Sequence, residues 1–133
     1  MSAEEDWLTR EDKECRTERL KRLEWITEKF HNNISFGLHY GGIKSKYLFD
    51  EVRYCFVYGQ YIAVILLSMS YIETMLASYY YGSGDNEIPF SAFSKILNQA
   101  KEDGILTEDE YNIFDNIRNI RNPLTHFKRP LDE

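Results

Sequence analysis

The chain has 133 residues, 43% of them hydrophobic and 29% charged, and a mass of 15.8 kDa. At roughly 150 residues per domain, this length predicts one domain spanning residues 1–133, with enough apolar content for a core. The formal net charge of −6 argues against a protein that coats nucleic acid or an anionic membrane through its overall charge, but it leaves room for a local basic site.

Cysteine and histidine usage predicts neither disulfides nor a metal site. Cys15 and Cys55 form no Cys-x-x-Cys pair, and His31 and His39 have no acid or thiol neighbour at ligand spacing. Residues 1–6 have neither the basic nor the apolar region of a signal peptide. We therefore expect a cytoplasmic protein without a metal or other cofactor.

The N-terminal part, residues 1–46, predicts a charged helix followed by a loop. Residues 4–31 have helical character, with a narrow apolar stripe late in the segment, formed by Leu20, Leu23, Ile26 and Phe30. Residues 32–46 contain two adjacent asparagines and three glycines, which is typical of a loop or turn.

Residues 47–81 hold half of the twenty aromatic residues of the chain. They predict a helix over 47–57, a break near Gly59 and a long helix over 60–81, with small residues for close helix approach at Ala63, Ser70 and Ala77. Residues 54–72 carry no charge, which fits either a transmembrane span or a helix buried on all sides of a soluble core. The interrupting polar residues favour the core helix, so we expect no membrane partner. The residues expected to fill that core are Ile62, Ile65, Leu66, Met69, Ile72, Met75 and Leu76.

The rest of the chain predicts two more helices. Residues 89–103 form the first, with Gly104 in the position of a helix-ending glycine. Thr107 and Glu110 then form a capping box, which opens a helix whose regular ladder Pro123 disturbs or ends. The apolar stripe of this last helix consists of Ile113, Phe114, Ile117, Ile120 and Leu124. With no alternating strand pattern, the fold class is all-α, an up-and-down bundle of four or five helices.

Residues 116–130 form a basic segment, with Arg118, Arg121, Lys128, Arg129 and no acid, so its net charge is +4 in a chain of −6. On a helix, Arg118, Arg121 and Asn122 project within about 100° of arc, and His126 follows four residues after Asn122. Arginine offers a planar fork to a phosphodiester, and histidine moves a proton near neutral pH. These groups suffice for attack of a ribose 2′-hydroxyl on its phosphate without a metal. The simpler alternative is a basic helix end that complements the helix dipole.

The string Arg121-Asn122-Pro123-Leu124-Thr125-His126 resembles the Arg–polar–x3–His motif of HEPN domains. The apolar helix pair that precedes it also resembles the central helices of these domains, so the resemblance covers residues 47–127. It implies a helical bundle that forms a homodimer, with the two motifs facing each other in one composite cleft. Many HEPN domains are metal-independent endoribonucleases of toxin–antitoxin, phage-defence and CRISPR-associated systems.

Carried onto this chain, the resemblance implies roles for individual residues. Arg121 would hold the scissile phosphate of a single-stranded RNA, Asn122 would orient the phosphate or the histidine, and His126 would act as general acid and base. Arg118, on geometry alone, and Lys128 are candidate substrate contacts. In the subgroup paired with nucleotidyltransferase antitoxins a tyrosine often stands where this chain has Lys128, so modification of a tyrosine there is not supported. An antitoxin or defence-system partner stays an expectation.

Two alternatives remain open. Other HEPN domains have lost catalysis, so the chain could be a non-catalytic module that binds a nucleotide or a partner protein. Glu73, in the most apolar helix, is either a buried partner that supports Arg118 or Arg121, or a carboxylate at a partly exposed position.

Overall fold

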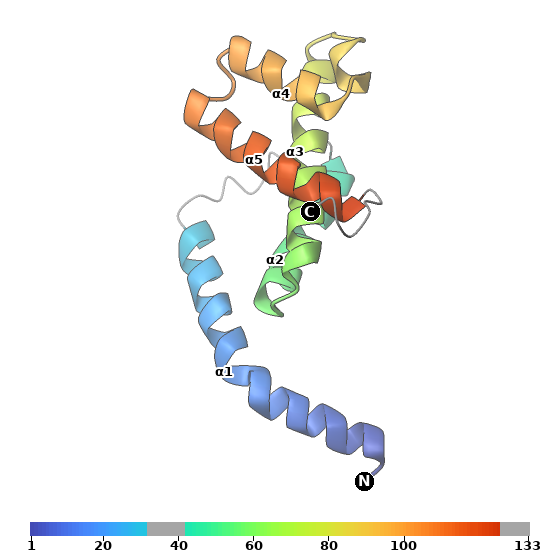
Figure 1. Ribbon diagram of the computed structural model, residues 1–133, viewed down its shortest axis with the longest axis vertical. Coiled ribbons are helices and arrows are strands. Elements are labelled where there is room, and N and C mark those ends of the chain that lie inside the picture. Colours follow the sequence, from blue (N-terminus) through green and yellow to red (C-terminus); the bar gives the residue numbers. More distant parts are fainter. Residues whose placement is uncertain (32–41, 126–133) are drawn as a thin grey trace.

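The computed structural model describes residues 1–31 and 42–125, and in them every regular element is a helix (Figure 1). The helices are α1 (Ala3–His31), α2 (Gly42–Val57), α3 (Tyr61–Gly82), α4 (Phe93–Glu102) and α5 (Glu108–Thr125), with a 3-10 turn, η1 (Ile88–Phe90), before α4. This confirms the all-α class.

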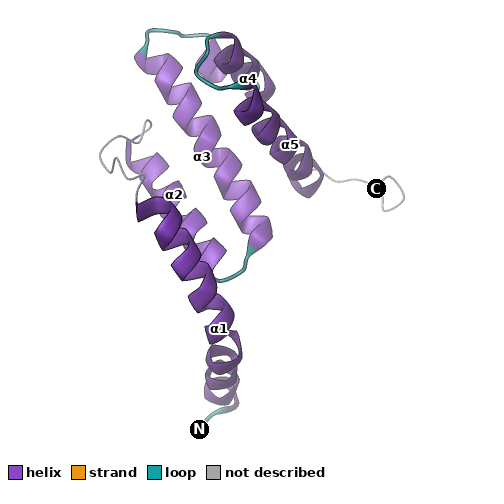
Figure 2. Cartoon of the chain, turned by 90° about the vertical axis from the view of Figure 1, so that its left-hand side faces the viewer, coloured by secondary structure: helices purple, strands orange, loops and turns teal. Residues whose placement is uncertain are grey.

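The helices α2 and α3 lie side by side and run antiparallel (Figure 2). The turn between them depends on Gly59, which has a φ of +74°, a value that side chains with a Cβ rarely adopt. The amides of Gly59 and Gln60 donate to the carbonyls of Phe56 and Cys55, which closes the end of α2 as a Schellman motif. The predicted break near Gly59 is therefore confirmed.

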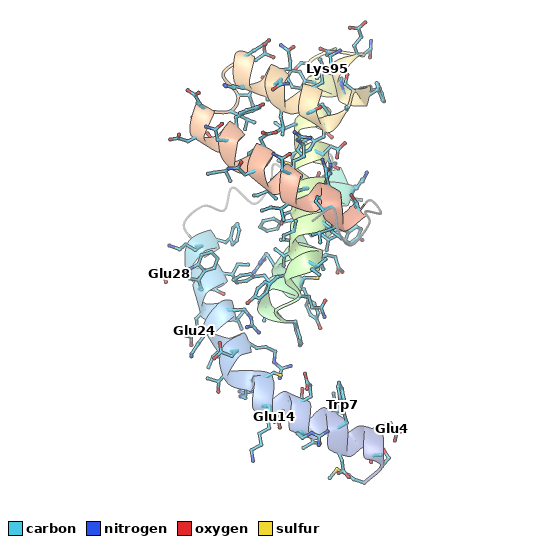
Figure 3. The ribbon with its side chains drawn as sticks, in the orientation of Figure 1. Glu4, Trp7, Glu14, Glu24, Glu28 and Lys95 are labelled. Atoms are coloured by element: carbon cyan, nitrogen blue, oxygen red, sulfur yellow. The ribbon has the colours of Figure 1, made fainter. Side chains whose placement is uncertain are left out.

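Only the second half of α1 packs on the body of the protein, where it lies against α2. Ile26 is buried there, and the Nε of Arg22 donates to the carbonyl of Val57 at 2.8 Å. The first half of α1 extends away from the other helices, and the helix bends near Glu14 (Figures 1 and 3).

The main core lies where the second half of α3, α4 and α5 pack against one another. Met69, Ile96 and Leu97 are completely buried in it. Tyr80 is also buried, and its hydroxyl donates to Asp103 at 2.7 Å; burial, followed by this hydrogen bond, raises the pKa of Tyr80. The other buried members of this core are Leu76, Ile88, Phe93, Ala100 and Leu106.

The capping box that the sequence predicts is present. The amide of Thr107 donates to Oε1 of Glu110 at 3.2 Å, and the amide of Glu110 donates to Oγ1 of Thr107 at 3.1 Å. Gly104, with a φ of +73°, ends α4 as predicted. Together these residues make the sharp connection from α4 to α5 and so fix the direction in which α5 leaves the core.

Two predicted boundaries were wrong. α2 begins at Gly42, so residues 42–46 are helical; Ser45 in this first turn is completely buried, which gives the turn a packed face. The predicted loop residues 32–41 lie outside the described part of the chain. The segment 89–103 is divided into η1 and α4, because Ser91 and Ala92 have extended backbones. α5 continues through Pro123 to Thr125, so of the two predicted effects of this proline, disturbing or ending the regular ladder, the structure shows the first, the loss of one amide donor.

The prediction that the apolar helix is buried on all sides was also wrong. Within α3 only Met69, Leu76 and Tyr80 are buried, and Ile62 is 62% exposed. The physical reason is that α1 packs on α2 and not on α3, while α4 and α5 cover one part of α3. α3 is long and apolar enough to cross a membrane, but the core helix of a soluble protein has the same length and composition.

The buried centre of the α3–α4–α5 core should dominate the stability of the fold. Ile96→Ala is expected to lower the free energy of unfolding by about 2–5 kcal/mol, because it removes packed methyl groups and leaves a cavity. Ile62→Ala, at an exposed position of α3, is the matched control and should change it by no more than about 0.5 kcal/mol. Urea unfolding followed by circular dichroism measures both; equal losses would contradict this assignment of the core.

Candidate functional site at the end of α5

The last two turns of α5 carry the described members of the predicted site. The capping box fixes where α5 begins, and Phe114 and Ile117 pack one side of it against the core. Arg121 and Asn122 then lie where α5 passes α3. Two other members of the predicted site, His126 and Lys128, lie outside the described residues.

Arg121 contacts side chains from three elements. Its Nη1 lies 3.8 Å from Oε2 of Glu73 on α3, and its Nη2 donates to Oδ1 of Asn122 at 3.3 Å. Its guanidinium carbon lies 5.8 Å from the centre of the Phe93 ring on α4, within the range of a cation–π contact. The guanidinium is therefore held between α3, α4 and α5.

One donor of Arg121 has no acceptor among residues 1–31 and 42–125. Its Nε is buried and forms no hydrogen bond with these residues, while the side chain as a whole is 21% exposed. A buried donor of this kind costs free energy unless a ligand or water supplies an acceptor. Arg121 can therefore donate a hydrogen bond to an anionic oxygen without giving up a strong hydrogen bond.

Glu73 combines features of the two interpretations that the sequence left open. Its carboxylate does lie beside Arg121, yet the side chain is 41% exposed, so it is not a buried ion pair. At 3.8 Å the contact is longer than a good charge-assisted hydrogen bond of about 2.7–2.9 Å. Glu73 thus holds Arg121 loosely, and its carboxylate partly offsets the positive charge of the guanidinium.

Arg118 does not join this cluster through Glu73. Its Nε and Nη2 both donate to Oδ1 of Asp115, at 3.2 and 2.9 Å, one turn earlier on α5. Asp115 was not among the residues predicted for the site, although an acid three residues before an arginine on a helix is a recognisable signal for such a pair. A phosphate that contacts Arg118 would have to compete with this carboxylate.

The end of α5 is held by Thr125. Its hydroxyl lies within hydrogen-bonding distance of the carbonyls of Arg121 and Asn122, at 3.4 and 3.2 Å. Pro123 lacks an amide hydrogen, so the carbonyl of Asn119 loses its usual helical donor. These contacts shape the last turn, after which the chain reaches His126.

The apolar stripe of α5 is only half used in the core. Phe114 and Ile117 pack against it, whereas Ile113, Ile120 and Leu124 are 55%, 54% and 43% exposed. An exposed apolar row beside a polar cluster is typical of a surface that contacts another molecule.

Among residues 1–31 and 42–125, no group of three or more His, Cys, Asp or Glu side chains is arranged to hold a metal ion.

Replacing Glu73 tests how strongly it is coupled to Arg121. Glu73→Gln keeps the shape but removes the charge, and we expect the free energy of unfolding to change by less than about 1 kcal/mol, because the pair is long and partly exposed. Denaturant unfolding at neutral pH measures it. A loss of about 3 kcal/mol or more would instead indicate a buried ion pair.

No family model, no curated protein and no solved structure matches this chain. The chemistry of the site is therefore inferred from its own side chains and from the motif that they form.

Proposed function

We propose that this protein is a metal-independent endoribonuclease of the HEPN type, which cleaves single-stranded RNA as a cytoplasmic homodimer. The observation that carries the proposal is the arrangement of Arg121, which combines a buried Nε that has no acceptor in the described part of the chain, a loose contact to Glu73 and a hydrogen bond to the neighbouring Asn122. In the motif, His126 follows Asn122 after three intervening residues.

The proposed reaction is attack of the ribose 2′-hydroxyl on the adjacent phosphate. His126 would take the proton from the 2′-hydroxyl, the 2′ oxygen would bond to phosphorus, and the bond to the 5′ oxygen would break with return of a proton to that oxygen. The products would be a 2′,3′-cyclic phosphate and a 5′-hydroxyl. Arg121 would stabilise the charge that develops on the phosphate oxygens, and Asn122 would orient Arg121 or the phosphate.

A homodimer would complete this site. The exposed apolar side chains of α5 supply a surface on the same helix as Arg121. Apposition of two such helices would bring two basic helix ends together, which would concentrate positive charge in one cleft of an acidic protein. A toxin or phage-defence role, with an antitoxin or defence-system partner, is the biological setting that we propose for this activity.

A non-catalytic binding module is the second candidate, and a specific observation favours it. Both described arginines of the site have a carboxylate within 4 Å, Glu73 for Arg121 and Asp115 for Arg118. These carboxylates lower the affinity of the site for phosphate and suit a surface that binds a nucleotide or protein weakly. Growth of cells that overproduce the protein separates the candidates: arrest that His126→Ala relieves supports the nuclease, and indifference supports the module.

Cleavage of single-stranded RNA in the presence of a chelator tests the catalytic proposal. Wild type should cleave, and Arg121→Ala and His126→Ala should each lower the rate at least about a hundredfold, the scale of a lost charge stabiliser or general acid–base. Asn122→Ala should retain part of the activity. Arg10→Ala, an exposed arginine near the free end of α1, is the matched control and should cleave as wild type. Equal cleavage by all variants would contradict the proposed site.

The proposed association through α5 can be tested by a single substitution. Ile120→Asp places a charge at an exposed apolar position of α5, so it should leave the fold intact but weaken association through α5 and cleavage together. Analytical ultracentrifugation at micromolar concentration measures the mass. An Ile120→Asp protein that is monomeric and fully active would contradict the composite site; Ile62→Asp, exposed on α3, is the control substitution.

A further inference from the structure

The N-terminal half of α1 has no packing partner among the described residues of its own chain. Residues 1–10 are all exposed, including Trp7 and Leu8 at 54% each, and this half extends away from the body (Figure 3). A helix of about 12–15 residues is only marginally stable in water unless one of its faces is packed. A partner that covers the apolar side chains of this half would therefore stabilise it.

An open groove of about 670 Å³ lies between α1 and the end of α2. Tyr58 lines it from the turn after α2, and Arg19 lies over the Tyr58 ring with its guanidinium carbon 5.3 Å from the ring centre. The residues that α1 contributes include Thr9, Asp12, Arg16, Arg19 and Leu23. These five are spaced alternately by three and four residues, which places them in one stripe along a helix.

The charges of α1 change sign along its length. Residues 3–14 carry six acidic and two basic side chains, whereas residues 15–26 carry four basic and two acidic ones. Within the stripe, Asp12 belongs to the acidic half and Arg16 to the basic half. Arg16 is exposed and forms no ion pair in the described structure. A second α1 in the opposite direction would therefore place the acidic half of each helix beside the basic half of the other.

We propose that this groove binds α1 of a second copy of the chain, antiparallel and related by a two-fold axis near Glu14. Such an axis places Asp12 opposite Arg16 of the partner subunit and Leu8 opposite the partner's Leu20, and each pair occurs twice because the interface is symmetric. The apolar side chains Leu8, Leu20 and Leu23, which are about half exposed in the single chain, become covered. This contact is separate from the α5 surface and does not depend on the proposed nuclease activity.

Charge reversal tests the register directly. Asp12→Arg and Arg16→Asp are prepared separately, both in an Ile120→Asp background so that association through α5 does not contribute. The Asp12 side chain is 63% exposed and Arg16 is exposed, so both variants should fold, which circular dichroism verifies. Each variant alone puts like charges opposite each other twice, and its dimer should be at least about tenfold weaker than that of the Ile120→Asp parent.

An equimolar mixture of the two variants decides the proposal. In a mixed dimer, both opposed positions again pair an acid with a base, so the mixture should return to within about threefold of the affinity of the parent. Sedimentation velocity measures the mass in each case. A parent that is monomeric up to about 100 µM, or a mixture that associates no better than its components, overturns the proposal. Binding of a single-stranded RNA 15-mer that is lost in Arg16→Asp, while the self-association of the protein without RNA stays that of the parent, would show that the groove belongs to nucleic acid and would also overturn it.

Discussion

The position of the candidate site depends on the packing of α3, α4 and α5 against one another. Met69, Ile96 and Leu97 are completely buried at this junction, and the Gly104 turn and the Thr107–Glu110 capping box direct α5 back across α3. As a result the last turns of α5 meet α3 and α4, and Arg121 contacts Glu73 and Phe93. Loss of this core would separate the guanidinium from the two side chains that position it.

The electrostatics of the protein restrict how it could bind an anion. The chain carries a net charge of −6, and each described arginine of the site has a carboxylate nearby. Such a surface attracts a long polyanion weakly, because the general field is repulsive and the local cations are partly neutralised. It suits the capture of a single phosphate group by Arg121, whose buried Nε has no acceptor among the residues that the structure describes. The charge distribution therefore favours local contact over extended binding.

Features set by local chemistry could be predicted from the sequence, and features set by neighbours could not. The Gly59 break, the end of α4 at Gly104 and the capping box each depend on residues a few positions apart. The exposure of Ile62 depends on where α1 packs, which no local pattern encodes. Within the site, helix geometry predicted only that Arg121 and Asn122 share one face of the helix, and the structure adds the hydrogen bond between them. The pairing of Arg118 with Asp115 was missed because Glu73 was the only carboxylate considered as a partner for this arginine. The places of His126 and Lys128 stay predictions.

The central claim is that Arg121, Asn122 and His126 direct a 2′-hydroxyl to its own phosphate. The most direct measurement is the chemical nature of the ends that the purified protein leaves on a single-stranded RNA of defined sequence in the presence of EDTA. The mechanism predicts a 2′,3′-cyclic phosphate on the upstream fragment and a 5′-hydroxyl on the downstream fragment, both readable by mass spectrometry. Fragments with 3′-hydroxyl and 5′-phosphate ends, or intact RNA, would contradict it.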